Sequence, residues 1–402
     1  MLVCLAGCSH YSASGDKVTD ISFWNGFSGP DGAAMEKIVQ RFNKENPDVH
    51  VQMQIIPWAT YYDKLTLGLA FGDPPDVFVL HANRVPEYAE HSALAQLDSY
   101  VTESGLKESD FVPKAWVAGL WDQKRFGLAL DCHPLGMYYN VKLFEEAGIE
   151  KPPVTQAEFL DAAKKLTKDL DGDGQPDQWG FAITDTHLVG TSILYQFGGG
   201  LLTPDMKHSA LDTAETKAGI DFMWDLINKY KVCPPPGSSD AWMGFQTGKI
   251  AMAPQGIWMI DSLDKQKNLR YAAAPFPLMG PVKAVWAGSH NLCMPAKIAP
   301  ARKDAAWRLI KFLSDNSLDW AKGGQVPVRT SVLSSKEFQG LRVQSQFAKQ
   351  LGYVQYEPFS LLINQMGPFG DAALEGALNG SETADHALSV ASRRVDQVLA
   401  RE

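Results

Sequence analysis

The stretch Gly72–Arg84, GDPPDVFVLHANR, decides the fold. Its four consecutive apolar residues, Val77–Leu80, lie between a Pro-rich turn and a polar segment. A short apolar run of this kind is typical of a parallel strand that is covered on both faces. Ligands of open α/β sheets bind outside the carboxyl ends of such strands, so His81, Asn83 and Arg84 are candidate binding residues. An ordinary strand followed by a solvated loop explains this stretch equally well.

The preceding segments alternate between strand and helix patterns. Ile21–Trp24 reads as a strand, and a turn with capping residues at Ser28–Gly32 follows it. Apolar residues spaced at i, i+3, i+4 and i+7 over Met35–Phe42 predict an amphipathic helix. Val49–Ile55 alternates apolar and polar residues, which predicts a half-buried strand, and a second helix is expected to start at Tyr61. Strand, helix, strand, helix, strand indicates parallel βαβ units and an α/β fold.

The rest of the chain continues this alternation. Further helices are predicted at Val141–Ala147, after the capping box Thr155–Glu158, and at Thr213–Tyr230, Asp304–Leu313 and Ala384–Val398. Strands are predicted at Met137–Asn140, Lys249–Ala253 and Tyr271–Ala274.

Composition narrows the class of protein. The 402 residues predict two or three compact domains, and 45% hydrophobic with 21% charged residues fits a soluble globular protein. The net charge of −9, with no basic run interleaved with aromatics, argues against a nucleic-acid partner. Eleven Trp residues point weakly to an aromatic-lined site, since flat aromatic faces also hold sugars. No run of 18 apolar residues predicts a membrane span.

The first residues, MLVCLAGC, resemble the end of a bacterial lipoprotein signal. Its Leu-Ala-Gly-Cys box implies cleavage before Cys8, lipidation of Cys8 and a protein anchored to the membrane outside the cytoplasm. The segment is short and lacks the positive n-region, so residues 1–15 are interpreted as a signal remnant and tether. A chance apolar N-terminus is the alternative.

The remaining cysteines are Cys132, Cys233 and Cys293. Their odd number and their spacing argue against a disulfide framework and against a zinc site. We expect buried thiols, with a Cys132–Cys293 bridge as an open alternative.

A second motif lies at Asp169–Gly180, DLDGDGQPDQWG. This segment reproduces most of a Ca²⁺ loop. It has carboxylates at positions 1, 3, 5 and 9 and a glycine at position 6, and the residue at position 7 would bind the ion through its backbone carbonyl. The candidate ligands are Asp169, Asp171, Asp173, Gln175 and Asp177. Position 12 is Gly180 where a Glu is expected. The pattern predicts a structural Ca²⁺ site, and a solvated acidic turn that caps the preceding helix is the alternative.

Other motifs do not support an enzyme. Gly244–Lys249 is one residue too short for a phosphate-binding P-loop and precedes a strand. The sequence has no Gly-x-Ser-x-Gly, His-Glu-x-x-His or Gly-x-Gly-x-x-Gly.

Six segments in order resemble the extracellular solute-binding proteins of ABC importers, in the maltose-binding-like family 1 that carries oligosaccharides. They are Trp24–Pro30, Gly72–Val77, Tyr138–Asn140, Phe245–Trp258, Trp286–His290 and Gly323–Arg329. The resemblance implies a monomer of two α/β lobes, each a mostly parallel sheet flanked by helices, with a hinge and an interlobe cleft. The implied N-lobe is 16–130 plus 288–328, and the implied C-lobe is 131–287 plus 329–402. It further implies binding without catalysis, and delivery of the ligand to permease subunits.

The resemblance also implies a set of ligand-binding residues. Asn83 and Arg84 match a polar pair that holds sugar hydroxyls, with Asn83 where those relatives carry an aspartate. Asp131 and His133 lie where the family places a carboxylate at the lobe crossover, and Trp258 matches a stacking aromatic. Residues on loops that face the cleft in relatives are Trp24, Trp58, Trp242, Trp286, His290, Arg329 and Tyr356. For each of them, a packing role is the alternative. Some polysaccharide-binding relatives also carry a Ca²⁺ loop in this region.

Two other functions remain open. A glycoside hydrolase also binds sugars in an aromatic cleft, and its two carboxylates would be Asp76 and Asp131. The same fold could instead carry a glycerol phosphate, for which Arg84 and Arg329 would supply the positive charge.

Overall fold

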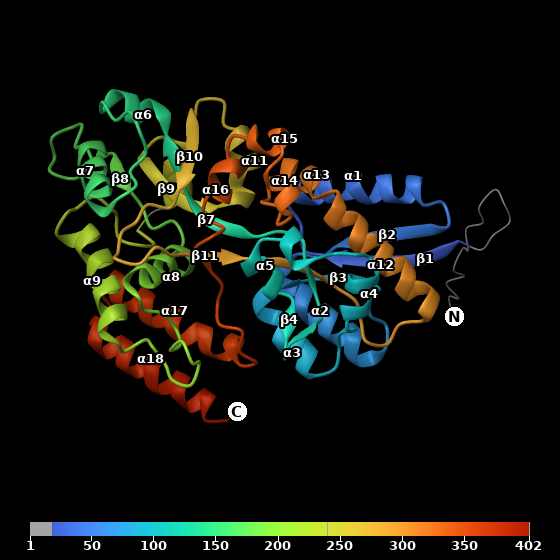
Figure 1. The fold of residues 1–402 in the computed structure, drawn as a ribbon. Coiled ribbons are helices and arrows are strands. Elements are labelled where there is room, and N and C mark those ends of the chain that lie inside the picture. The colour runs from blue at the N-terminus through green and yellow to red at the C-terminus, as the bar shows by residue number, and fades with distance from the viewer. Residues whose placement is uncertain (1–17, 239, 402) are drawn as a thin grey trace, which may run out of the picture. The chain divides into compact units, whose positions relative to one another are not determined.

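The computed structural model describes residues 18–238 and 240–401. The chain divides into two compact units (Figure 1). Unit 1 is the chain up to Asp131 together with Ser289–Val332, and unit 2 is Cys132–Gly288 together with the chain from Leu333 onward. Each unit is therefore built from discontinuous pieces. The predicted signal remnant and Cys8 lie outside the described residues.

Unit 1 contains a five-stranded sheet in the order β2-β1-β3-β12-β6. Its strands are β1 Thr19–Asn25, β2 Val49–Ile55, β3 Val77–His81, β6 Leu128–Ala129 and β12 His290–Cys293. β1 is parallel to β2 and β3, which confirms the predicted βαβ units. β12 is antiparallel to β3 and β6. A separate hairpin pairs β4 Leu120–Trp121 with β5 Lys124–Arg125.

Helices flank this sheet. They are α1 Pro30–Glu45, α2 Trp58–Phe71, η1 Ala82–Arg84, α3 Val85–Glu90, α4 Asp98–Glu103, η2 Glu108–Asp110, α5 Pro113–Val117, α12 Pro300–Asp315 and α13 Ser317–Lys322, with α14 Thr330–Leu333 at the boundary between the units. The cap expected at the start of α1 is wrong, because its N-cap is Gly29 and no side chain caps the helix there.

Unit 2 contains a six-stranded sheet in the order β13-β11-β7-β9-β8, with β10 also paired to β7. Its strands are β7 His133–Asn140, β8 Trp179–Phe181, β9 Ile250–Gly256, β10 Tyr271–Pro275, β11 Val285–Gly288 and β13 Val354–Gln355. The expected mostly parallel sheet needs correction here, because β7 is antiparallel to β9, β10 and β11. A strand buried on both faces has the same apolar pattern whichever way its neighbours run, so the sequence does not fix their direction.

The sequence did not reveal several of the helices of unit 2. The full set is α6 Val141–Glu146, α7 Gln156–Leu166, α8 Thr186–Phe197, α9 Ala214–Asn228, α10 Ala241–Gln246, η3 Ile257–Met259, α11 Ile260–Asp264, α15 Lys336–Gln339, α16 Gln344–Ala348, α17 Ile363–Asn379 and α18 Ala384–Leu399. The capping box at the start of α7 is confirmed, with reciprocal bonds between Thr155 and Glu158. α8 and α17 were missed. α8 is apolar on most of its surface, and Pro368 interrupts the pattern of α17.

A membrane-spanning helix was not expected. Across the described residues, no helix combines the length and the apolar character that crossing a bilayer requires.

Candidate functional site: two aromatic clusters

The strand that the opening stretch predicted is β3. Val77, Phe78, Val79 and Leu80 are each 0% exposed, so the strand is covered on both faces. The chain then leaves the sheet at His81 and turns through η1, where Asn83 and Arg84 are half-buried. The polar residues therefore follow the carboxyl end of a buried strand, as predicted.

Three predicted residues of unit 1 come together around Trp58. The rings of Trp58 and His290 are stacked, with centroids 5.7 Å apart and planes within 6°. The His81 ring centroid lies 4.4 Å from that of Trp58 and 4.9 Å from that of His290. Phe27, which was not predicted, packs edge-on against His290 at 4.9 Å. We call Phe27, Trp58, His81 and His290 the unit 1 cluster.

A buried carboxylate fixes His290. Asp131 is 0% exposed and accepts hydrogen bonds from the His290 backbone N–H at 3.0 Å and from the Trp320 indole at 2.8 Å. Its Oδ2 also lies 2.8 Å from His290 Nδ1. An ionised carboxylate only accepts hydrogen bonds, so Nδ1 carries a proton and the orientation of the imidazole ring is set. Trp320 was not predicted, because its helical segment carries no motif.

Arg84 reaches the unit 1 cluster through Tyr62. The Arg84 guanidinium lies 4.5 Å from the Tyr62 ring centroid, and its Nη1 is 3.4 Å from a Glu87 carboxylate oxygen. The Tyr62 hydroxyl is 2.5 Å from His81 Nδ1 and accepts the His81 backbone N–H at 3.2 Å. Burial raises the pKa of Tyr62, so this hydroxyl stays protonated.

Trp24 and Arg329 occupy different surroundings. Trp24 is half-buried, with Lys64 Nζ 4.7 Å from its ring centroid. The Arg329 guanidinium lies 4.8 Å from the Phe111 ring centroid, and its Nη1 is 3.7 Å from Asp315 Oδ1. These contacts hold Arg329 against Phe111 and α12, and Arg329 lies in unit 1.

Three buried amide side chains of unit 1, those of Asn25, Asn291 and Gln325, carry atoms without a hydrogen-bond partner among the described residues. Within residues 18–238 and 240–401, Asn25 Nδ2 and Gln325 Oε1 have no hydrogen-bond partner. Gln325 Nε2 lies 3.4 Å from Asp31, and burial raises the pKa of that carboxyl although the charge of His290 opposes the shift. Buried polar atoms normally find a partner, which in many proteins is an ordered water. Sequence reasoning missed these amides.

Three predicted residues of unit 2 form a second cluster. The His133 ring meets Trp258 edge-on with centroids 5.7 Å apart, and its centroid is 6.3 Å from that of Trp286. Both His133 and Trp258 rest on glycine backbone. A Cβ on Gly256 would lie 2.1 Å from the Trp258 ring, and one on Gly288 would lie 2.2 Å from His133 Nε2. We call His133, Trp258 and Trp286 the unit 2 cluster.

Charged residues support one side of the unit 2 cluster. The Trp286 indole N–H donates to Glu357 Oε1 at 3.4 Å. His187 Nε2 lies 2.9 Å from the same carboxylate oxygen, and His187 Nδ1 lies 2.6 Å from Asp371 Oδ1. Burial lowers the pKa of His187, but its bonds to Asp371 and Glu357 outweigh burial and raise it to about 10.

Tyr356 and Trp242 make contacts elsewhere in unit 2. The Tyr356 hydroxyl donates to Cys132 Sγ at 3.3 Å, and its ring stacks on Phe359. Trp242 stacks on Phe245 with centroids 5.6 Å apart and meets Tyr138 edge-on. Its buried indole N–H has no partner among the described residues. These contacts give Trp242 a place in the packing of α10 against β7.

The cysteines of the described chain are buried and form no disulfide, as expected. They are Cys132, Cys233 and Cys293. Burial raises the pKa of the Cys233 thiol to about 12, which keeps it protonated and unreactive.

The acidic loop of unit 2 gathers three of its predicted ligands. Carboxylate oxygens of Asp169, Asp171 and Asp177 lie within 4.8 Å of one another, and all three residues are exposed. Asp169 also accepts backbone N–H groups from Gly172 at 2.7 Å and Gly174 at 2.9 Å, and these bonds lower its pKa.

Two further ligand positions of this loop are less favourable. Asp173 Oδ1 accepts the Gln175 N–H at 2.7 Å, and Asp173 is outside the close group. At position 12, a Cβ on Gly180 would lie 2.0 Å from the Ala163 carbonyl oxygen, so the packing of β8 on α7 excludes a glutamate there. Oxygen ligands suit Ca²⁺, and the loop fits it in part.

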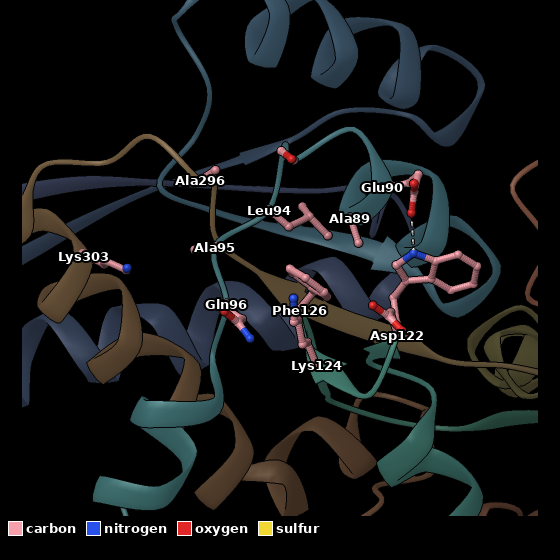
Figure 2. Close-up of a pocket in the computed structure, with 12 residues that line it drawn as sticks. Ala89, Glu90, Leu94, Ala95, Gln96, Asp122, Lys124, Phe126, Ala296 and Lys303 are labelled. Carbon is pink, nitrogen blue, oxygen red and sulfur yellow. Dashed lines mark hydrogen bonds between the residues drawn. The ribbon is translucent and has the colours of Figure 1, made fainter.

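Unit 1 also has a surface hollow of about 420 Å³ beside the β4–β5 hairpin (Figure 2). Trp121 and Glu90 are among its lining residues, and the Trp121 indole N–H donates to Glu90 at 2.9 Å. The other charged residues that line the hollow are Asp122, Lys124 and Lys303, so the hollow carries charges of both signs. No predicted ligand residue lines this hollow. We therefore base the function on the two aromatic clusters, which combine flat faces with fixed polar partners.

Comparison with known proteins places the chain in context. The profile of the family described as bacterial extracellular solute-binding protein matches residues 26–317. A maltotriose-binding protein of Pyrococcus abyssi is 23% identical, over 91% of this chain and 79% of the relative. An sn-glycerol-3-phosphate-binding periplasmic protein of Escherichia coli strain 536 is 24% identical, over 97% of this chain and 94% of the relative.

A solved structure matches over nearly the whole length. The crystal structure of a cyclic α-maltosyl-1,6-maltose binding protein from Arthrobacter globiformis is 25% identical, with a TM-score of 0.80. It covers 96% of this chain and 100% of its own.

Proposed function

The chain belongs to the family of bacterial extracellular solute-binding proteins, and on that premise we propose that it binds a carbohydrate outside the cytoplasm and delivers it to an ABC importer. The ligand we propose is an oligosaccharide or a glycoside. The observation that most supports this ligand class is the stacked pair of Trp58 and His290, held by the buried Asp131. Relatives that bind maltotriose and a cyclic maltosyl-maltose give it independent support.

The chemistry of the two clusters suits a sugar. A sugar ring has apolar C–H faces and a rim of hydroxyls, so its site needs flat apolar surfaces beside a few fixed hydrogen-bonding groups. Trp58 and Trp258 supply flat faces, while His81 and His133 lie against them. Because polar partners hold the rings of His290 and Trp286, these two side chains lose little entropy when a ligand binds.

The proposed mechanism is capture by closure. Hinge closure around a ligand is a known motion of periplasmic binding proteins, and its extent follows the ligand's preference for the closed state. We expect the radius of gyration measured by X-ray scattering to fall when a bound carbohydrate saturates the protein. An unchanged scattering curve at saturation would contradict closure.

Calorimetry on a neutral panel of maltose, maltotriose, trehalose and cellobiose tests the ligand class. We expect at least one member to bind, and Trp258→Ala to weaken that binding by about 1–3 kcal/mol, the scale for a large apolar side chain. Trp224→Ala, at a tryptophan that is 41% exposed on α9, is the matched control and should bind like the wild type. Failure of the whole panel to bind would overturn the proposal.

Two competing functions, binding of sn-glycerol 3-phosphate and hydrolysis of a glycoside, can be tested on the same preparation of the protein. The E. coli relative and the half-buried Arg84 favour sn-glycerol 3-phosphate as the second candidate ligand, so it belongs in the calorimetric panel. Catalysis is less favoured. Asp76 is held by Ser22 and Arg302, and Asp131 by three donors, so neither carboxylate is placed to act on a glycosidic bond. Chromatography of the panel after prolonged incubation should show no hydrolysis products.

We also propose a structural Ca²⁺ in the acidic loop, supported by the three gathered carboxylates. Calcium at ten times its dissociation constant would stabilise unit 2 by about 1.4 kcal/mol and raise its melting temperature by about 3 °C. Asp171→Asn should abolish this shift, whereas Asp161→Asn, at an exposed carboxylate paired with Lys165, should keep it. The same melting temperature in calcium and in chelator would rule the site out.

We further propose that the protein is attached to the membrane through Cys8 and that it is a monomer. The wild type expressed in bacteria should sediment with membranes, and Cys8→Ser should appear in the soluble fraction. Light scattering of the Cys8→Ser protein should give the mass of one chain.

A further inference from the structure

Three charged side chains of unit 2, distant in the sequence, form one cluster. His187 is the second residue of α8, Glu357 follows β13, and Asp371 lies within α17. The two ring nitrogens of His187 lie 2.9 Å from Glu357 Oε1 and 2.6 Å from Asp371 Oδ1. Ionised carboxylates accept hydrogen bonds and do not donate them, so both ring nitrogens carry protons. His187 is therefore an imidazolium between two carboxylates.

The position of this cation is unfavourable by itself. His187 is the second residue of α8, where the positive end of the helix dipole repels a cation. The carboxylates of Glu357 and Asp371 offset that repulsion. One positive and two negative side chains leave the cluster with a net negative charge, and that charge borders the unit 2 cluster.

Glu357 joins the charged cluster to the candidate ligand residues. Its Oε1 accepts the Trp286 indole N–H at 3.4 Å, and Glu357 directly follows Tyr356 in the sequence. The Glu357 side chain is 20% exposed, so it combines firm support with access to solvent. The loop around Glu357 has no recognisable motif, and sequence reasoning missed it.

We propose that Glu357 is a specificity-determining residue that selects neutral, hydroxyl-bearing ligands, and that His187 and Asp371 are positioning residues that hold it beside Trp286. The inference rests on the proposed carbohydrate-binding function. A carboxylate accepts hydroxyl hydrogens in strong charge-assisted bonds. The same carboxylate repels a phosphate, so it discriminates by attraction and by repulsion together.

Glu357→Gln is the decisive variant, because the amide keeps the shape of the side chain and removes its charge. In calorimetry, this variant should bind the tightest-binding sugar of the neutral panel with about tenfold lower affinity than the wild type. The ratio of its affinity for that sugar to its affinity for sn-glycerol 3-phosphate should also fall. His187→Gln should weaken the same sugar about three- to fivefold, because Glu357 remains but is no longer held. Glu145→Gln is the matched control, since Glu145 is an exposed carboxylate bonded to Arg270.

A measurement without ligand tests the positioning role. In a nitrogen-15 spectrum of labelled tryptophan, the indole signal of Trp286 is assigned by its loss in Trp286→Phe. His187→Gln and Glu357→Gln should each shift that signal, and Glu145→Gln should not. An unmoved signal in His187→Gln would overturn the positioning role even if the variant were less stable.

The outcomes separate this inference from the proposed function. If Trp258→Ala weakens the sugar while Glu357→Gln binds it like the wild type, the carbohydrate function stands and the specificity role of Glu357 falls. If the wild type binds sn-glycerol 3-phosphate more tightly than every sugar in the panel, both fall.

Discussion

The two aromatic clusters are supported in different ways. In unit 1, the stacked pair of Trp58 and His290 is held by Asp131, which is fully buried and accepts three hydrogen bonds. In unit 2, Trp286 is held by Glu357, which belongs to a charged cluster open to solvent. Asp131, the anchor in unit 1, lies within a hydrophobic core, whereas Glu357, the anchor in unit 2, is partly exposed to solvent.

This difference separates stability from binding. A buried carboxylate that loses a partner leaves an unsatisfied polar group in the core, so damage to it destabilises the fold. A half-exposed ion cluster is screened by water and contributes little to stability. Its remaining effect is on the position and the charge of the groups around it. We therefore expect changes in unit 1 to act mainly on unfolding, and changes in unit 2 to act mainly on affinity.

The largest effect should come from Asp131→Asn. The amide group turns at least one acceptor into a donor that faces His290 or Trp320, so the variant should lose about 3 kcal/mol of unfolding free energy. Urea titration measures this loss. Asp48→Asn, at an exposed carboxylate paired with Arg308, is the control and should change stability by less than about 1 kcal/mol. Equal midpoints for the two variants would remove the contrast between buried and exposed anchors.

The next effect should come from Gly26→Ala. The new Cβ would lie 2.2 Å from the Trp58 ring, which also contacts Tyr61, His81 and His290 and so has little room to move. Such overpacking costs about 1–3 kcal/mol of stability. Urea unfolding of this variant, with Gly352→Ala as a control in open space, measures it. A wild-type midpoint for Gly26→Ala would show that the stacked pair is adjustable.

These contrasts also explain what the sequence could reveal. The strand at Val77–Leu80 was predictable because a short apolar run between turn signals is typical of a strand buried on both faces, and β3 confirms it. The direction of the strands beside β7 was not predictable, because burial on both faces hides it. The charged cluster was hidden by distance, since His187 lies 170 residues from Glu357 and 184 from Asp371. Only folding brings these three side chains together.

The mirror experiment in unit 2 is Gly256→Ala. The added Cβ would lie 2.1 Å from the Trp258 ring, but this ring is half-buried and can turn toward solvent. We expect a stability loss below about 1 kcal/mol and an affinity for the tightest sugar reduced about tenfold, close to 1.4 kcal/mol. Calorimetry measures the loss of affinity and urea unfolding measures the loss of stability, both on the same preparation. A large loss of stability with unchanged affinity would place Trp258 in the core.

The smallest effect should be a dependence of stability on pH that comes from His187. Its pKa is raised from 6.5 to about 10 by the fold, so the native chain binds more protons than the unfolded chain between these values. The stabilisation from His187 is complete below pH 6.5 and is lost as the pH rises toward 10. Because the side chain is 38% exposed, water screens the effect, and we expect no more than about 1 kcal/mol.

Subtracting the His187→Gln curve isolates this contribution, because lysines and tyrosines that titrate near pH 10 are common to both proteins. The difference in urea midpoint between wild type and variant should shrink steadily from pH 7 to pH 9.5. Parallel curves over that range would mean that His187 carries no extra proton in the native state. The anchor of unit 2 would then be an ordinary polar contact, and the contrast with the buried anchor of unit 1 would rest on burial alone.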